Sequence, residues 1–92
     1  MRQDEAEVIG VQALGWIAAK DDLLDVFMGS SGVGLDMMRE NAQDPEFLAS
    51  VLDFLCLDDA WVTEFCESHD LPTDRPMRAR QALPGGQQVH WT

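Results

Sequence analysis

Apolar residues recur along this chain at the three- and four-residue spacing of a helix face, and short polar breaks separate the apolar stretches. Ile9, Ala13, Trp16 and Ile17 form such a face near the N-terminus, and the stretch 47–55 forms a wider one. No stretch alternates apolar and polar residues, and the chain has no Tyr, so a sheet is disfavoured. The pattern predicts helices over residues 4–19, 21–28, 35–42 and 45–57, a fifth from 58–59 through 66, and a last one from 74 to 83.

Carboxylates mark the points where these helices are expected to begin. Asp44-Pro45-Glu46 is the clearest start, with an N-capping acid, proline at the first helical position and an acid in the first turn. Asp4 and Glu7 have the spacing of a capping box, which predicts Asp4 as the N-cap of the first helix. Such carboxylates accept hydrogen bonds from free backbone N–H groups and face the positive end of the helix dipole. Eleven of the seventeen carboxylates sit in or beside an expected first turn: Asp4, Glu5, Glu7, Asp21, Asp22, Asp36, Asp44, Glu46, Asp58, Asp59 and Asp74.

The predicted fold class is therefore all-α, a compact orthogonal bundle of five or six short helices. With 92 residues the chain should form one domain, expected over residues 1–86. The stretch 47–55 carries the widest apolar stripe and is predicted to be the most buried helix. Residues 87–92 follow a double glycine and show no helical pattern, so we expect a disordered tail there.

Glycines suggest where backbones approach one another and where a helix ends. Gly10 and Gly15 lie inside the first expected helix, where each costs about 1 kcal/mol relative to Ala, so another backbone should pack close to both. The segment 29–34, Gly-Ser-Ser-Gly-Val-Gly, is expected to end the second helix, which runs through Met28. It also has the glycine spacing of a phosphate-binding loop. However, Leu35 and Asp36 stand where that loop needs Lys and Ser or Thr, and no strand precedes it, so we interpret it as a connector.

The net charge of -11 is large and unevenly divided. Residues 1–70 carry a net charge of -13, and residues 71–92 carry +2. Because an acidic surface repels nucleic acid and anionic lipid, neither is expected as a partner. No apolar run approaches the roughly 20 residues that span a membrane, and the N-terminus lacks the apolar core of a signal peptide. We therefore expect a cytoplasmic protein in which Cys56 and Cys66 remain thiols.

Cys66 and His69 offer the residue types of a thiol nucleophile and its base, and on a helix they would share a face. Cys66 is expected near a helix C-terminus among carboxylates, which oppose thiolate formation, and His69 is explained as a cation at a helix end. Cys56 adds a third soft ligand, but no C-x-x-C pair anchors a metal site and the acids do not form a calcium loop. We therefore predict no cofactor and no metal.

Arg75, Arg78 and Arg80 form the basic end of the chain. They either complement the C-terminal end of their own helix and pair with nearby carboxylates, or they meet an acidic surface on a partner or on another copy of the chain. Three arginines are too few to indicate nucleic-acid binding against so acidic a background.

Asp53 lies inside the most hydrophobic stretch, where an unpaired buried carboxylate would be costly. It either occupies the polar side of its helix or pairs with Arg39 or Arg80 and so joins two helices.

The three tryptophans divide by context. Trp16 and Trp61 lie in apolar stripes and are expected in the core or at its edge. Trp91, beside His90, is either an exposed tail residue or an anchor for a partner's groove.

Four segments resemble one family: Ala-Leu-Gly-Trp-Ile-Ala at 13–18, Asp-Pro-Glu-Phe-Leu at 44–48, Val-Leu-Asp-Phe-Leu at 51–55 and Ala-Arg-Gln-Ala-Leu-Pro-Gly at 79–85. Together they resemble the small bacterial family catalogued as domain of unknown function 3572, over roughly residues 6–86. The resemblance implies a compact, cytoplasmic, all-helical protein with no assigned activity, cofactor or catalytic residue. No functional residue is therefore carried over, and the two cysteines and His69 lie outside the family pattern.

The function expected from these features is that of a small acidic, non-enzymatic module for protein–protein interaction or regulation, which binds an unidentified protein partner or itself. Its contact surfaces should be the Arg75–Arg80 end and any uncovered part of the stripes 47–54 or 61–65. The alternative is a thiol-dependent enzyme or redox-active protein that uses Cys66 and His69. A third class, mimicry of nucleic acid, needs carboxylates on one face, which helix starts spread around a bundle do not provide.

Overall fold

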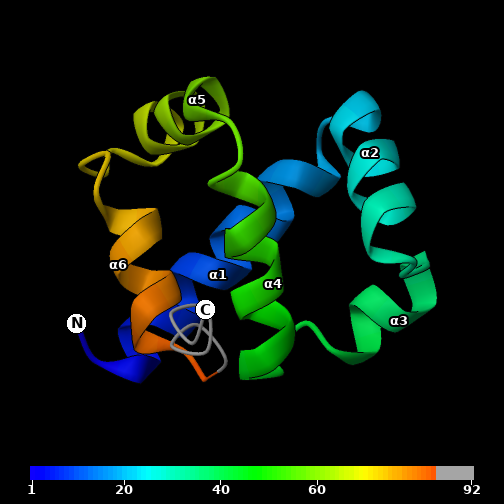
Figure 1. Ribbon diagram of the computed structural model, residues 1–92, viewed down its shortest axis with the longest axis horizontal. Coiled ribbons are helices and arrows are strands. Elements are labelled where there is room, and N and C mark those ends of the chain that lie inside the picture. The colour runs from blue at the N-terminus through cyan, green and yellow to red at the C-terminus, as the bar shows by residue number, and fades with distance from the viewer. Residues whose placement is uncertain (85–92) are drawn as a thin grey trace, which may run out of the picture.

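The longest helix, α1 (Gln3–Ala18), forms the support on which most of the other helices pack. The computed structural model describes residues 1–84, and over this range the chain forms six helices and no strand. α1 passes behind α4 and α6 in Figure 1 and packs against both of them and against α2, while α4 also packs against α6. The predicted fold class, an all-α bundle of five or six short helices, is confirmed. The other five helices are α2 (Asp21–Ser31), α3 (Leu35–Glu40), α4 (Pro45–Leu55), α5 (Asp59–His69) and α6 (Arg75–Ala82).

None of the helices within residues 1–84 is both long enough and apolar enough to cross a membrane. The tail expected over residues 87–92, with His90 and Trp91, lies outside the described residues.

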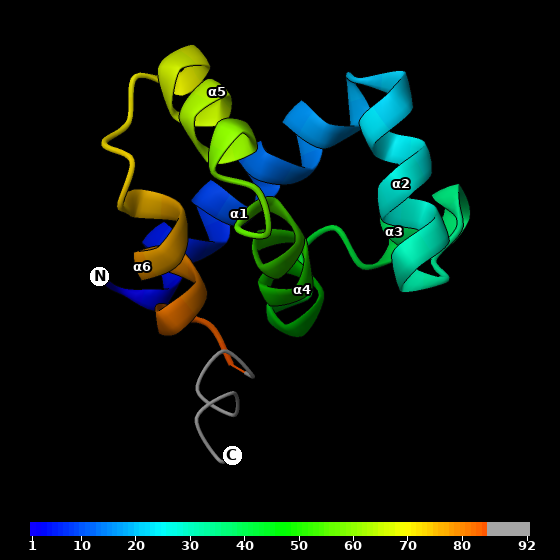
Figure 2. The ribbon, with the colours of Figure 1, turned by 45° about the horizontal axis from the view of Figure 1, so that its top comes forward.

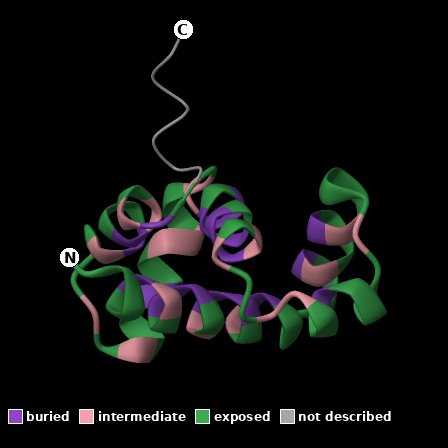
Figure 3. Ribbon diagram, turned by 90° about the horizontal axis from the view of Figure 1, so that it is seen from below, coloured by how far each residue is buried: buried purple, intermediate pink, exposed green. Residues whose placement is uncertain are grey.

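The core forms where the apolar faces of α1 and α4 meet. Ile9 and Ile17 of α1 are buried there, as are Leu48 and Leu52 of α4. Six of the eleven residues of α4 are buried, the largest share of any described helix, so the prediction that this is the most buried helix is confirmed. Figure 3 shows the buried residues on the inner sides of the helices and the exposed ones outside. Each large apolar side chain that leaves water there contributes about 1.5–3 kcal/mol to folding.

A ladder of aromatic rings joins three helices. Phe27 of α2 meets two rings of α4 edge-on, with ring centroids 6.2 Å from Phe47 and 5.1 Å from Phe54. Phe54 in turn stacks on Trp61 of α5 at 5.0 Å. We call these four residues the aromatic ladder. Because aromatic pairs in such arrangements add about 0.5–1.5 kcal/mol beyond their buried area, the ladder helps to hold α2 and α5 to α4.

The two glycines inside α1 have different surroundings. A Cβ atom added at Gly10 would lie 2.9 Å from Leu48 Cβ, so α1 and α4 approach closely there, as the sequence predicts. A Cβ atom added at Gly15 would meet nothing within 4 Å, so the prediction of a close approach at this residue is wrong. Gly15 lies on the exposed side of the helix, where no neighbouring helix requires a missing side chain.

Two capping acids are confirmed and one is not. The Asp44 and Asp58 side chains accept hydrogen bonds from the N–H groups of Glu46 (3.1 Å) and Ala60 (2.8 Å), as expected at helix starts. Asp4, by contrast, lies within the first turn of α1 rather than at its N-cap, which is Arg2.

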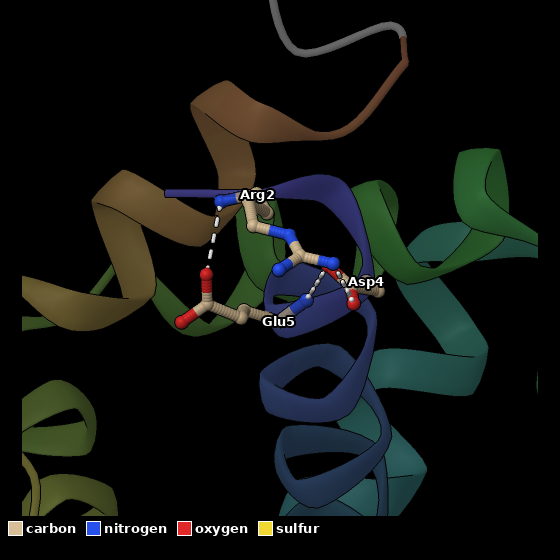
Figure 4. Close-up of polar contacts among 3 residues, drawn as sticks. All are labelled: Arg2, Asp4 and Glu5. Atoms are coloured by element: carbon tan, nitrogen blue, oxygen red, sulfur yellow. Dashed lines mark hydrogen bonds and ion pairs between the residues drawn. The ribbon is translucent and has the colours of Figure 1, made fainter.

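Three contacts explain why α1 begins earlier than predicted. The Arg2 N–H donates to Glu5 Oε1 at 3.3 Å, and the Arg2 guanidinium pairs with Asp4 at 3.0 Å. The Glu5 N–H donates to Asp4 Oδ1 at 3.0 Å (Figure 4). The acids therefore stabilise the first turn from inside it, and the arginine side chain covers the start of the helix.

α2 ends within the glycine segment, as predicted, but the helix continues past Met28 and Gly29 to Ser31. The hydroxyls of Ser30 and Ser31 donate to the Phe27 carbonyl at 3.3 and 2.7 Å, within the last turns of the helix. Its C-cap is Gly32, which has φ 74° and whose N–H donates to the Met28 carbonyl. Glycine is favoured at this residue because it enters the left-handed region without steric cost, whereas Gly29 inside the helix does not enter it.

Candidate interaction site

An open groove lies between the C-terminal end of α1, the first turns of α2, and α5. Figure 2 shows α5 and α2 on opposite sides of this end of α1. The groove has a volume of about 580 Å³. We call it the tryptophan groove; it is lined by Trp16, Lys20, Asp21, Asp22, Leu23, Val26, Trp61 and Glu64.

Two half-buried indole rings form its aromatic lining, and each is fixed from behind by a buried phenylalanine. Trp16 meets Phe65 edge-on at a centroid distance of 6.0 Å, and Trp61 stacks on Phe54. Both tryptophans pack against the core, which confirms the prediction that they lie in the core or at its edge. Since the rings behind them are fully packed, the indoles are held in place before any ligand arrives.

The charged side chains of the groove are mostly acidic. Asp21, Asp22 and Glu64 are exposed and form no hydrogen bond or ion pair through their carboxylates with any of the described residues. Lys20 supplies the positive charge, and its Nζ atom lies 4.9 Å from the centroid of the Trp16 ring, at cation–π distance. The groove thus combines aromatic faces with unpaired carboxylates.

A second, smaller groove lies between α1 and the start of α4. It has a volume of about 370 Å³ and is lined by Asp4, Glu7, Val8, Val11, Gln12, Gln43 and Leu48. Two of its polar side chains already have partners, because Asp4 binds the first turn of α1 and Glu7 accepts from Gln3. No aromatic ring lines it, so it lacks the anchors that characterise strong binding surfaces.

The three arginines of α6 do not form a single surface. Arg75 and Arg78 both pair with Asp74, at 4.0 and 3.7 Å, and both remain partly exposed. The Arg80 side chain is only 13% exposed and pairs with Asp53. Arg80 therefore takes part in an ion pair between two helices, and only Arg75 and Arg78 of the basic end remain accessible to a partner.

Asp53 occupies a position that combines the two alternatives set out from the sequence. Its side chain is 50% exposed, as expected on the polar side of α4, and it pairs with Arg80 of α6 rather than with Arg39. The pair joins α4 to α6 at the edge of the core. Because one partner is half in water, the pair is weaker than a fully buried one but also carries a smaller desolvation cost.

Cys66 and His69 lie on the same helix but bind different groups. The Cys66 thiol is buried and donates to the Pro72 carbonyl at 3.4 Å. His69 Nδ1 lies 3.1 Å from the Phe65 carbonyl, which can only accept, so this nitrogen carries the proton in that contact. Its ring also packs on Phe65 at 4.5 Å. The structure therefore gives each side chain its own structural partner.

The pKa values of both thiols are raised above their ordinary range. Burial is the main cause for Cys66, and the nearby Asp74 carboxylate adds to it. Burial also raises the pKa of Cys56, with smaller contributions from Cys66 and Asp59. Both cysteines are free thiols. Within residues 1–84 no three His, Cys, Asp or Glu side chains are grouped so that they could hold a metal ion.

The sequence does not predict the tryptophan groove. Asp21 and Asp22 indicate only a helix start, and neither Glu64 nor Val26 belongs to a sequence pattern that indicates a binding surface. The two tryptophans at the edges of apolar stripes were the single available clue, because a large ring at such an edge is half covered and half exposed. Which three helices meet there depends on tertiary packing.

Comparison with known proteins identifies a family to which this chain belongs but assigns no activity to it. A family model described as "Protein of unknown function (DUF3572)" matches residues 3–86. No curated protein and no solved structure matches the chain.

Proposed function

Because this chain belongs to the DUF3572 family of proteins of unknown function, we propose its function from the chemistry of its surface. The protein is a small acidic, non-enzymatic module that binds another protein through the tryptophan groove. The observation that carries this proposal is the pair of indole rings, Trp16 and Trp61, each half exposed in one groove and each backed by a buried phenylalanine ring.

Tryptophan is enriched among the residues that contribute most to binding energy at protein interfaces. Its ring offers a large apolar area at a small cost in conformational entropy, and the packing behind Trp16 and Trp61 lowers that cost further. The groove volume of about 580 Å³ also lies within the range of roughly 300–1,000 Å³ that is usual for binding clefts. A segment of a few residues from a partner would fill it.

The basic end of α6 is a second candidate surface, for a partner or for another copy of the chain. Its support is weaker, because Asp74 already neutralises part of the charge on Arg75 and Arg78, and Arg80 is turned inward toward Asp53. Surface pairs of this kind contribute little to affinity, since water and salt screen them.

A non-enzymatic role is supported by the state of the thiols. A cysteine nucleophile needs a lowered pKa, and burial and Asp74 raise the pKa of Cys66 instead. His69 binds the Phe65 carbonyl rather than the thiol. Two free cysteines also fit the reducing cytoplasm, which we infer as the location of the protein.

The test is affinity capture from a lysate of the source organism with a variant that blocks the groove. Val26 is 51% exposed and lines the groove, so Val26→Arg places a bulky charged side chain there without disturbing the core. Met37→Arg on α3 is the matched control, because Met37 is 52% exposed and lies outside the groove. We expect a specific protein that the wild type and Met37→Arg retain and that Val26→Arg loses.

The Arg75→Ala/Arg78→Ala variant separates the two candidate surfaces. If the tryptophan groove is the binding site, this variant retains the same protein as the wild type. A partner that is lost with the arginine variant but kept with Val26→Arg would move the site to α6. Recovery of no specific protein by any variant would count against a binding module.

A further inference from the structure

We propose that the ligand of the tryptophan groove is an arginine side chain within a basic segment of another protein, and that Lys20 occupies its place over Trp16 in the unbound state. This inference rests on the proposed function and names the chemistry of its partner. It is carried by the combination of aromatic faces, unpaired carboxylates and an internal cation already seated on one ring.

The lining chemistry selects for a cation. Asp21, Asp22 and Glu64 are exposed carboxylates with no hydrogen bond or ion pair among the described residues, so their charges are available to a ligand. The faces of Trp16 and Trp61 attract positive charge through their ring quadrupoles. An anionic ligand would meet three negative charges for one positive, whereas a basic ligand is attracted by the three carboxylates and by both indole faces.

Arginine fits better than lysine. The guanidinium group is planar and weakly hydrated, so it stacks on an indole face and still directs several N–H donors sideways. Carboxylates flank the tryptophans here on two different helices, Asp21 and Asp22 on α2 and Glu64 on α5. A compact ammonium group satisfies one such neighbour well, while a guanidinium fork can reach two.

Lys20 shows that the site accepts a cation over an aromatic face. Its Nζ atom lies 4.9 Å from the Trp16 centroid, and its side chain forms no ion pair among the described residues. A ligand arginine that stacks on Trp16 must displace it. Lys20 therefore competes with the ligand, and its removal should strengthen binding although it sits in the site.

Basic groups of the protein itself are less suited to this role. Four of its six basic side chains pair with its own carboxylates: Arg2 with Asp4, Arg75 and Arg78 with Asp74, and Arg80 with Asp53. A second copy of the chain would also bring its own large negative charge. The charge complementarity therefore favours a separate basic partner.

The experiment titrates the full-length chain with the peptide acetyl-Gly-Arg-Gly-Arg-Gly-amide at low salt. A Trp91→Phe background leaves two indole N–H resonances, those of Trp16 and Trp61, which report on the groove by NMR. We expect both to shift in a saturable way. The same peptide with citrulline in place of arginine keeps the shape and loses the charge, and it should bind about tenfold more weakly.

Two triple variants separate the groove from overall charge. The groove variant is Asp21→Asn/Asp22→Asn/Glu64→Gln, and the control is Asp36→Asn/Glu46→Gln/Glu67→Gln, which neutralises three exposed carboxylates elsewhere, two of them also in first turns of helices. Both change the net charge equally. We expect the groove variant to bind about tenfold more weakly and the control to bind within about twofold of wild type.

A second pair of variants tests the competing lysine and needs no disturbance of the acids. Lys20→Ala and Arg39→Ala each remove one positive charge, and Arg39 is exposed and lies outside the groove. Lys20→Ala should bind the arginine peptide about threefold more tightly, and Arg39→Ala should change affinity by less than about twofold. Weaker binding by Lys20→Ala would overturn the assignment of this residue.

Several results would overturn the proposal. Equal binding of the arginine and citrulline peptides, or an equal loss of peptide affinity in both triple variants, would show that the groove does not recognise a cation. Equal binding of the corresponding lysine peptide would overturn the choice of arginine. Indole shifts that depend on protein concentration and vanish in Arg75→Ala/Arg78→Ala would identify a second copy as the occupant. If the arginine peptide fails but Val26→Arg still loses a captured protein, this inference falls while the proposed function stands.

Discussion

Asp53 and Arg80 show how one pair of side chains joins two helices at the edge of a small core. The carboxylate is half exposed on α4, and the arginine is largely buried on α6. Asp53 lies between Leu52 and Phe54, both buried, and its position in the sequence suggested a paired residue without identifying the partner. That choice between Arg39 and Arg80 depends on which helix packs beside α4, and so on tertiary structure.

The first prediction concerns this pair. Asp53→Asn removes the charge that faces Arg80, so we expect a loss of about 1 kcal/mol in the free energy of unfolding. For a chain of this size that corresponds to a melting temperature lower by about 4–8 °C. The control is Asp25→Asn, since Asp25 is exposed on α2 and forms no ion pair among the described residues. Equal melting temperatures of the two variants would show that the pair contributes nothing.

The second prediction follows from the raised pKa values of Cys66 and Cys56. A thiol whose pKa is higher in the folded than in the unfolded protein holds its proton more tightly when folded. Its contribution to stability is therefore complete below the unfolded pKa, about 8.5, and is lost as pH rises through the folded value. The chain has no Tyr and a single Lys, so few other groups titrate in this range.

We expect the free energy of unfolding, measured with urea, to fall as pH rises above about 8.5. The double variant Cys56→Ala/Cys66→Ala should be less stable at neutral pH, because it leaves a cavity, but should show a flatter dependence on alkaline pH. A wild type whose stability rises over the same interval would contradict the direction assigned to the two thiols.

At the scale of the elements, the starts of the helices follow from the sequence better than their ends. Asp44 and Asp58 cap where predicted, because a capping acid acts within three residues of itself. The glycine segment ends α2 as predicted, but the helix passes through Gly29 and ends only before Gly32. α5 ends at Asp70, which adopts φ 56°, and no glycine signals this end. Asp enters the left-handed region more readily than most side chains, so such ends are hard to read.

Gly10 and Gly15 provide the third prediction, since they occupy the same helix with opposite surroundings. Gly15→Ala meets nothing within 4 Å and should stabilise α1 by about 1 kcal/mol through helix propensity. Gly10→Ala gains the same propensity but forces its new methyl group against Leu48 Cβ. The net result should be a loss of about 1–2 kcal/mol.

Thermal unfolding of both variants beside the wild type measures the two effects. The opposite signs are the essential result, because composition and helix are the same for both substitutions. Stabilisation by Gly10→Ala would show that α1 and α4 can separate at no cost. Destabilisation by Gly15→Ala would place an unrecognised neighbour at that residue.

For the whole molecule, the all-α class and the dominant role of α4 could be predicted from helical spacing and capping acids alone. The tryptophan groove could not, because α5, which supplies part of its lining, is distant in sequence from α1 and α2, which supply the rest. The acids at residues 21 and 22 illustrate the limit: they open a helix, as predicted, and they also line the groove. The sequence pattern predicts that these acids begin a helix, but it does not predict that they line a groove.

The fourth prediction concerns the net charge of -11. Repulsion among so many carboxylates opposes the compact state, and salt screens it. We expect the melting temperature to rise by a few degrees between about 20 mM and about 300 mM NaCl. The variant Asp36→Asn/Glu46→Gln/Glu67→Gln should show a smaller rise, since it carries less charge. A melting temperature that falls with salt would mean that ion pairs such as Asp53–Arg80 outweigh the repulsion.

The aromatic ladder has a consequence for how the sequence is free to vary. Phe54 holds Phe27 on one side and the groove residue Trp61 on the other, at centroid distances of 5.1 and 5.0 Å. A substitution that changes the size of the Phe54 ring requires compensating changes at both Phe27 and Trp61, because a packed interior has no spare volume. Positions 27, 54 and 61 should therefore evolve together across the family. Substitutions of the groove residue Trp61 would then be accompanied by substitutions of Phe54, a core residue that does not line the groove.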